Sequence, residues 1–180
     1  MVRTDLTRRV FLIGFMGAGK TSVGRALARR LGWKFHDLDD VIEEREGRTV
    51  AAIFADAGEP EFRRAERAAL ASLLQAGGHA DHLVIALGGG TFVAEENRAA
   101  IERAAGTTIL LEAPLEELRR RCGSEDRIRP LSKQEARFAE LFASRRHAYE
   151  QAQFRVGTMG KEIEQVAEEI EKILSAASRR

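Results

Sequence analysis

Short apolar runs alternate along the chain with stretches in which apolar residues recur every three or four positions. The runs predict buried strands, and the helical repeats predict amphipathic helices. Strands are expected at about 10–13, 33–36, 83–87, 107–111 and 154–156. Helices are expected at about 20–31, 41–46, 49–57, 61–74, 97–105, 115–121, 134–151 and 161–176. Because helices separate the strands throughout, we predict a three-layer α/β/α domain around a central five-stranded parallel sheet.

Glycine, proline and threonine mark several of the predicted boundaries. Gly32 and Gly47 are expected to end the first two helices, and Thr49 is expected to cap the third. The sequence Gly58-Glu59-Pro60 breaks the chain before the next helix, and Pro114 opens the helix that follows the fourth strand. No linker or repeat divides the sequence, so residues 1–180 are interpreted as one domain.

A phosphate-binding loop is predicted where the first strand meets the first helix. The residues from Gly14 to Thr21 have the pattern Gly, four residues, Gly, Lys, Thr. Glycines at this spacing let backbone N–H groups approach phosphate oxygens, and the following helix adds its positive dipole end. Lys20 is expected to reach the β- and γ-phosphates, and Thr21 to offer its hydroxyl to Mg²⁺. The predicted nucleotide-binding residues of this segment are Gly14, Gly17, Ala18, Gly19, Lys20, Thr21 and Ser22.

The composition excludes some classes of partner. Hydrophobic residues at 44% and charged residues at 32% are typical of a soluble globular protein. A net charge of +1 gives no electrostatic argument for nucleic acid or an acidic membrane surface. The single cysteine, Cys122, excludes an internal disulfide and fits a reducing compartment. No run approaches the roughly 18 apolar residues of a membrane span. We therefore expect a cytoplasmic protein.

Two carboxylates follow the second predicted strand, in the sequence Asp37-Leu38-Asp39. If this segment stays extended, alternation places Asp37 and Asp39 on the same side of the backbone. Asp37 is then expected to organise Mg²⁺ through water, and Asp39 to accept a hydrogen bond from a substrate hydroxyl. The alternative is that Asp39 or Asp40 caps the next helix.

The strand at 83–87 ends in three glycines, where a motor or transport ATPase usually has an acidic residue. The sequence also lacks the Asn-Lys-x-Asp stretch with which guanine-specific proteins bind their base. Both observations favour a small-molecule kinase. The triplet Gly88–Gly90 permits close approach of backbone N–H groups to a ligand, and the alternative is a plain turn.

Arg63 and Glu66 are three positions apart on a predicted helix, so they share a face and can pair. A guanidinium held by a carboxylate is suited to bind a substrate carboxylate through two hydrogen bonds. Arg64 and Arg67 are interpreted as solvated surface residues.

The motifs GFMGAGKTSVG, DLD, GEPEFRRAE, ALGGGTF and IRPLS, in this order, resemble those of the shikimate kinase family over nearly the whole chain. The resemblance implies a nucleoside-monophosphate-kinase-like fold and ATP-dependent phosphorylation of the 3-hydroxyl of shikimate. It also implies that Arg121 lies against the adenine and that Arg129 reaches the transferring phosphate. The shikimate-binding residues that it implies are Asp39, Arg63, Gly88, Gly89, Gly90 and Arg145.

Several assignments stay open at this stage. The lid, at about 123–134, has Ser132 where the family motif has leucine, and Arg127 competes with Arg129 for the same role. Arg146 likewise stands beside Arg145. A kinase of another small hydroxy acid such as gluconate is the main alternative, and a nucleotide-sensing protein without catalysis is another. We predict a monomer that uses ATP and Mg²⁺, with Lys20, Asp39 and Arg129 as catalytic residues and Thr21 and Asp37 at the metal.

Overall fold

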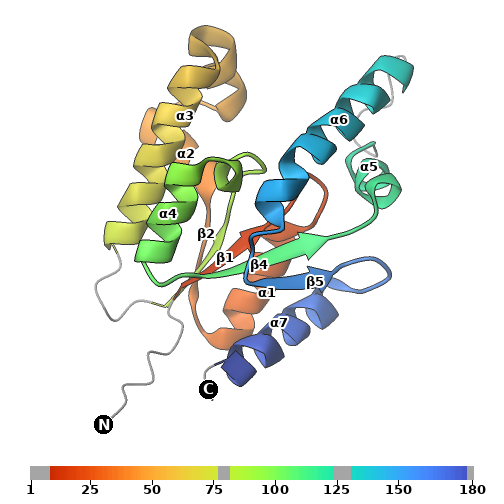
Figure 1. The fold of residues 1–180 in the computed structure, drawn as a ribbon. Coiled ribbons are helices and arrows are strands. Elements are labelled where there is room, and N and C mark those ends of the chain that lie inside the picture. The colour runs from red at the N-terminus through yellow and green to blue at the C-terminus, as the bar shows by residue number, and fades with distance from the viewer. Residues whose placement is uncertain (1–8, 77–81, 124–130, 178–180) are drawn as a thin grey trace.

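Five parallel strands form the centre of the structure, a computed structural model that describes residues 9–76, 82–123 and 131–177. The strands lie in the order β2-β3-β1-β4-β5 (Figure 1). Their bounds are β1 Arg9–Ile13, β2 Lys34–Asp37, β3 Leu83–Ala86, β4 Thr107–Glu112 and β5 Phe154–Gly157. The helices are α1 Lys20–Leu31, α2 Leu38–Glu46, α3 Val50–Ala76, α4 Glu95–Arg103, α5 Leu115–Gly123, α6 Leu131–Tyr149 and α7 Ile163–Ala177, with a 3₁₀ turn at Thr91–Val93. The predicted five-stranded parallel sheet is confirmed.

Helices cover both faces of the sheet (Figure 1). Helices α1 and α7 pack together on one face, while α3 and α4 lie on the other. Strand β1 is central, and its residues Val10, Phe11 and Leu12 are fully buried, as a strand covered on both sides requires. The predicted three-layer architecture is therefore confirmed. Helices α5 and α6 extend beyond the carboxyl ends of β1 and β4, where ligands of open parallel sheets bind.

The predicted helix boundaries agree closely with the structure where local chemistry sets them. Helix α1 has the predicted bounds, and Gly32 and Gly47 end their helices with φ of 68° and 65°. Thr49 Oγ1 accepts a hydrogen bond from the Ala52 N–H at 3.1 Å, so the predicted cap is confirmed. At Gly58 the chain bends with φ of 75°, and helix α3 continues beyond the bend.

The condition under which Asp37 and Asp39 would share one side, an extended backbone through Asp39, is not met. The extended backbone ends at Asp37, and α2 begins at Leu38. The cause is that Asp37 is itself the capping residue, since its Oδ1 accepts the N–H of Asp39 at 3.1 Å. The alternative, in which Asp39 or Asp40 caps the helix, is therefore wrong as well.

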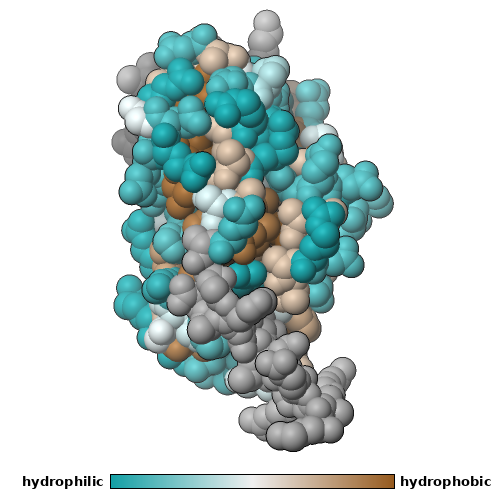
Figure 2. Space-filling view, turned by 90° about the vertical axis from the view of Figure 1, so that its left-hand side faces the viewer, coloured by the Kyte–Doolittle hydropathy of each residue, from teal (hydrophilic) through white to brown (hydrophobic). Residues whose placement is uncertain are grey.

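The core joins the sheet to the helices that carry the site. A Cβ atom at Gly24 of α1 would lie 2.4 Å from the Phe35 ring, so glycine lets α1 and β2 approach closely. This contact fixes the phosphate loop relative to the end of β2. Figure 2 shows the face of α3 and α4, on which hydrophilic residues predominate. Among the described residues, no helix combines the length and the apolarity that a membrane span needs.

Candidate active site

The loop between β1 and α1 has the geometry of a phosphate-binding loop. Gly14 has φ of 151°, and a Cβ atom there would lie 2.5 Å from the Leu111 carbonyl oxygen. Gly19 precedes α1 with φ of 88°, in the left-handed region that favours glycine. No side chain of the described residues caps α1, so its first N–H groups remain available to an anion. The loop thus offers a backbone site for phosphate.

Lys20 points back into this loop. Its Nζ donates to the carbonyl oxygens of Gly14, at 2.9 Å, and Phe15, at 3.1 Å. Burial lowers the pKa of Lys20 to about 8, while the nearby carboxylates of Asp39 and Asp37 oppose this shift. Phosphate oxygens in the loop would supply the negative charge that a buried ammonium needs.

Thr21 and Asp37 lie side by side next to the loop. Thr21 Oγ1 donates to Asp37 Oδ2 at 2.6 Å. Hydroxyl and carboxylate oxygens are the hard ligands that Mg²⁺ prefers, so this pair fits the predicted metal. The described residues contain no cluster of three or more His, Cys, Asp or Glu side chains suited to a metal. Phosphate and water oxygens would therefore have to complete the coordination.

Asp39 lies in the first turn of α2 and faces the end of β3. A Cβ atom at Gly88 would lie 3.0 Å from Asp39 Oδ1, so the two residues are in direct contact. Burial raises the pKa of Asp39 to about 6, helped by the charge of Asp37 and opposed by Lys20. The structure therefore brings Asp39 to the glycine triplet and into the electrostatic field of Lys20, although the segment is helical.

Arg63 of α3 reaches the same triplet. Its guanidinium would lie 2.6 to 3.1 Å from a Cβ atom at Gly90, so only glycine allows this approach. Arg63 Nη1 donates to Glu66 Oε2 at 2.9 Å, which confirms the predicted pair. Glu66 is buried, and its other oxygen accepts the Thr91 hydroxyl at 2.6 Å. As predicted, Arg64 is exposed and pairs with Glu61 on the surface.

Arg145 of α6 approaches the triplet from the other side. A Cβ atom at Gly89 would lie 2.9 Å from Arg145 Nη1. The guanidinium lies 5.6 Å from the centroid of the Phe15 ring, within range of a cation–π contact. Arg146, by contrast, has a side chain that is 73% exposed and pairs with Glu150. Of these two arginines, Arg145 is the one that lies at the glycine triplet.

Two residues of this cluster, Tyr149 and Thr91, were not predicted from the sequence. The Tyr149 hydroxyl donates to the Gly89 carbonyl oxygen, and Thr91 ties the triplet to buried Glu66. Tyr149 is one helical turn beyond Arg145, so both lie on one face of the helix. This spacing is the sequence feature that could have indicated Tyr149. No comparable spacing indicates the contact between Thr91 and Glu66, because these residues are 25 positions apart.

Arg121 of α5 contacts the middle of the phosphate loop. Its Nη1 contacts the Gly17 carbonyl oxygen at 3.3 Å and the Thr158 hydroxyl at 3.0 Å, while its Nε donates to Glu117. The predicted lid arginines, Arg129 and Arg127, lie outside the described residues, as do most residues of the predicted lid.

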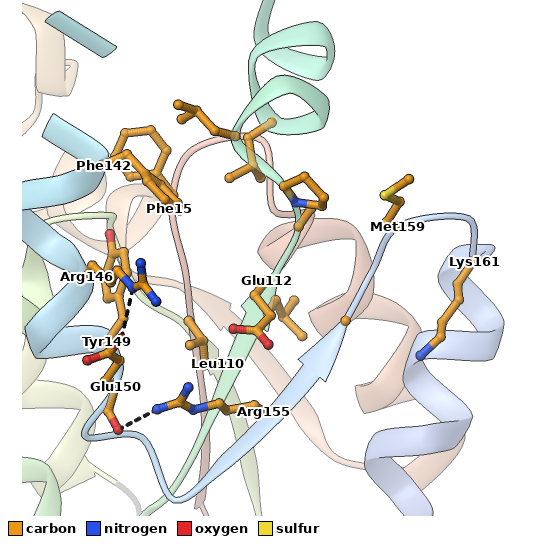
Figure 3. Close-up of a pocket in the computed structure, with 16 residues that line it drawn as sticks. Phe15, Leu110, Glu112, Phe142, Arg146, Tyr149, Glu150, Arg155, Met159 and Lys161 are labelled. Atoms are coloured by element: carbon orange, nitrogen blue, oxygen red, sulfur yellow. Dashed lines mark hydrogen bonds and ion pairs between the residues drawn. The ribbon is translucent and has the colours of Figure 1, made fainter. Parts of the chain in front are cut away.

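A cavity of about 600 Å³ adjoins these residues between β4, β5, α5 and α6 (Figure 3). Phe15 and Phe142 form one end of it, and Glu112 and Arg155 project from the sheet. The Phe15 carbonyl oxygen also accepts a hydrogen bond from Lys20 Nζ. The hydroxyl of Tyr149, another lining residue, donates to the Gly89 carbonyl oxygen. The cavity therefore shares Phe15 and Tyr149 with the site, but its lining does not include Lys20, Asp39, Arg63 or Arg145.

Comparisons with known proteins agree on one family. The family model for shikimate kinase matches residues 16–175. The chain is 43% identical over 166 residues to the shikimate kinase of Geobacter metallireducens, covering 91% of this chain and 89% of that protein. The structure of shikimate kinase from Acinetobacter baumannii in complex with shikimate matches with a TM-score of 0.84 and 30% identity, over 96% of this chain and 95% of that one. A gluconokinase from Sinorhizobium meliloti shares the fold alone, with a TM-score of 0.63 and 16% identity over 97% of this chain and 95% of that one.

Proposed function

Because this chain belongs to the shikimate kinase family, we propose that it transfers the γ-phosphoryl group of ATP to the 3-hydroxyl of shikimate. The observation that carries the proposal is the meeting of Asp39, Arg63 and Arg145 on one glycine triplet beside Lys20. This arrangement joins a triphosphate site to a site for a carboxylated alcohol. Gluconate, the alternative acceptor, has no comparable support from the family.

The phosphate loop would hold the triphosphate. We assign this role to the backbone N–H groups from Gly14 to Ser22, including Ala18, and to the ammonium of Lys20. Lys20 is buried, and among the described residues its hydrogen bonds go to carbonyl oxygens, so incoming phosphate would supply it with an anionic hydrogen-bond partner. Such fixed charge and dipoles stabilise negative charge that develops on phosphoryl oxygens.

Thr21 and Asp37 would hold Mg²⁺, and their hydrogen bond supports this assignment because it brings a hydroxyl and a carboxylate together. A bound Mg²⁺ neutralises charge on the β- and γ-phosphates. Asp37 has a second task, since its other oxygen fixes the N-terminus of α2 and thereby the position of Asp39.

Arg63 and Arg145 would bind the carboxylate of the acceptor. They contact neighbouring glycines, Gly90 and Gly89, and each is held by a protein group, Glu66 for Arg63 and the Phe15 ring for Arg145. Guanidinium groups that are already fixed lose little conformational entropy when a ligand binds. Backbone groups of Gly88–Gly90 would contact the ring of the substrate, where no side chain intervenes.

Asp39 would orient the 3-hydroxyl and accept its proton. The O–P bond forms as the bond between the γ-phosphorus and the bridging oxygen breaks, ADP leaves, and the hydroxyl proton passes to a carboxylate oxygen of Asp39. Since the transition state is loose, correct placement matters more than basicity. With a pKa of about 6, Asp39 is mostly ionised at neutral pH and is able to accept a proton.

Other assignments rest on the sequence. We propose that Arg129 in the lid reaches the transferring phosphoryl group, with Arg127 as the alternative, and that Arg121 borders the adenine. A monomeric state and a cytoplasmic location stay predictions.

The test is an ADP-release assay on the purified protein with ATP, Mg²⁺ and a panel of acceptors. Shikimate should stimulate ADP release at least 100-fold, and phosphorus NMR should show one new phosphate monoester. Gluconate should give no stimulation. Absence of stimulation by shikimate, or stronger stimulation by gluconate, would refute the assignment.

A further inference from the structure

Glu117, on the first turns of α5, binds two neighbouring arginines through one carboxylate. Its oxygens accept from Arg120 Nε and Nη2 at 2.8 and 2.7 Å, and from Arg121 Nε at 2.8 Å. These hydrogen bonds lower the pKa of Glu117 to about 2, so the group is ionised at any neutral pH. Both arginines thus share one permanent counter-ion.

Only one of the two arginines continues to the phosphate loop. The hydrogen bonds that the structure gives Arg120 end at Glu117, and its side chain is 73% exposed. Arg121 is 26% exposed and reaches both Gly17 and Thr158. Arg120 and Arg121 can therefore be compared directly, because the same carboxylate binds one arginine in solvent and one at the phosphate loop.

Arg121 bridges two walls beside the phosphate loop. Its Nη1 and Nη2 contact the carbonyl oxygens of Gly17, at 3.3 Å, and Thr158, at 3.2 Å. Thr158 is itself fixed, because it is buried and its N–H donates to the Glu112 carbonyl at 2.8 Å. The guanidinium is therefore held at three points, by α5, by the phosphate loop and by the segment after β5.

We propose that Glu117 is a positioning residue that holds Arg121 in place to bind the base of the nucleotide. This inference rests on the proposed function, because that function places a nucleotide in this loop. A planar guanidinium presents a face on which an aromatic base stacks. Because Glu117 binds Nε, the guanidinium keeps its plane and its reach when the contacts to Gly17 and Thr158 give way to a ligand. Glu117 thereby sets affinity for the base and leaves affinity for phosphate unchanged.

The position of Arg121 supports a role at the base. Lys20 donates to the Gly14 carbonyl oxygen, and the charged groups that influence it most are Asp39, assigned to the acceptor, and Asp37, assigned to the metal. Arg121 contacts the loop at Gly17 and otherwise faces the segment after β5. The two cations thus contact the phosphate loop at different residues, Gly14 and Phe15 for Lys20 and Gly17 for Arg121, and the proposal assigns Arg121 to the base.

The experiment compares Glu117→Gln with Arg120→Gln in the full-length protein. Affinity for ADP is measured by calorimetry, and affinity for inorganic tripolyphosphate, which has no base, by competition against ADP. Glu117→Gln should weaken ADP binding and raise KM for ATP by roughly threefold to tenfold, as expected for a charge-assisted bond that is partly solvated. Tripolyphosphate affinity, KM for shikimate and kcat should each change less than about twofold. Arg120→Gln should change none of them by more than that.

Several results would overturn the proposal. If Glu117→Gln binds ADP as tightly as the unsubstituted protein does, Glu117 does not position Arg121 for binding. If Glu117→Gln loses affinity for tripolyphosphate as much as for ADP, Glu117 acts on phosphate binding and not on the base. A loss in Arg120→Gln as large as in Glu117→Gln would indicate a general effect on α5. In an Arg121→Ala background, Glu117→Gln should have no further effect on ADP affinity, and a persisting effect would contradict action through Arg121. These binding measurements need no acceptor, so they stand apart from the test of shikimate phosphorylation.

Discussion

Lys20 illustrates how a buried charge is stabilised before substrate arrives. Two carbonyl oxygens of its own loop accept its hydrogen bonds, and the carboxylates of Asp37 and Asp39 offset part of the cost of burial. A lysine whose hydrogen bonds in the described residues go to carbonyl dipoles gains strongly from an anion. Its role should therefore be visible in the chemical step as well as in binding.

We expect Lys20→Met to lower kcat at least 1,000-fold, because the substitution keeps the length of the side chain but removes the charge from the phosphates. Steady-state kinetics with saturating ATP and shikimate measures this. The control is Lys172→Met, since Lys172 is 73% exposed and pairs with Glu168 on α7. Near-normal turnover in Lys20→Met would remove Lys20 from the catalytic residues.

Burial of the Asp39 carboxyl should lower the free energy of unfolding at neutral pH, although the proposed reaction uses this group. Its folded-state pKa of about 6 exceeds its ordinary value of 3.8, so folding disfavours the ionised carboxyl. For an acid with a raised pKa, the penalty is absent below about pH 4, grows as pH rises towards 6, and is complete above it. The shift corresponds to about 3 kcal/mol, on the rule of about 1.4 kcal/mol per pKa unit, and an amide in the same place would recover part of it because it is itself polar.

We therefore expect Asp39→Asn to raise the free energy of unfolding by about 1–2 kcal/mol at pH 8 and to leave it nearly unchanged at pH 3.5. The same variant should lose at least about 100-fold in kcat, because an amide does not accept the hydroxyl proton. Urea unfolding at both pH values, with activity at pH 8, tests the pair. Asp40→Asn is the matched control, since Asp40 is the exposed neighbour. A destabilised Asp39→Asn at pH 8 would contradict the assigned cost of burial.

At the scale of elements, the last turn of α6 supports the glycine triplet. Tyr149 lies in the core, and its hydroxyl donates to the Gly89 carbonyl oxygen. The residue one turn earlier, Arg145, contacts the same glycine. Helix α6 therefore fixes both the backbone of the triplet and one of the groups assigned to the substrate carboxylate.

Tyr149→Phe should raise KM for shikimate by about threefold to tenfold, because the Gly89 carbonyl loses a buried hydrogen-bond partner and the turn loosens. KM for ATP should stay within twofold, since the phosphate loop keeps its contacts. Arg146→Ala, on the exposed side of the same turn, serves as control. If both KM values rise together, the tyrosine supports the fold in general and not the triplet.

Element by element, the sequence predicted what local chemistry determines. Gly32 and Gly47 ended their helices as expected, and the Arg63–Glu66 pair formed because three positions on a helix bring side chains together. The backbone does not stay extended through Asp39, because Asp37 caps a helix that begins at Leu38, earlier than the predicted start at about 41. Thr91 and Tyr149 were missed because their partners come from other elements, which local patterns do not reveal.

At the scale of the whole molecule, the strand order assembles the site. Strands β2, β3 and β1 are neighbours, so Asp37, the triplet that follows β3 and the phosphate loop meet at one edge of the sheet. Arg63 and Arg145 reach that edge from α3 and α6, two helices far apart in the chain. The sequence indicated that both arginines matter, and only the fold brings them to adjacent glycines.

Their convergence predicts how the two substitutions combine. If Arg63 and Arg145 bind one carboxylate, each single substitution to alanine should raise KM for shikimate at least about 30-fold, since each removes a charge-assisted contact. The double variant should then raise KM much less than the product of the two single factors. The reason is that, once one arginine is gone, the carboxylate is no longer held in the geometry that the other arginine needs. Guanidinium groups that bind separate parts of the substrate would give factors that multiply.

The residues next to Arg63 and Arg145 provide a matched control for this comparison of single and double variants. Arg64 and Arg146 follow Arg63 and Arg145 on the same helices, but their side chains are 58% and 73% exposed and pair with surface glutamates. The Arg64→Ala and Arg146→Ala pair removes the same total charge, so it corrects for a general electrostatic effect on an anionic substrate. If this control raises KM for shikimate as much as the first pair does, attraction by overall positive charge explains the result. A normal KM in the control and a less-than-multiplicative rise in the first pair would identify one carboxylate held between α3 and α6.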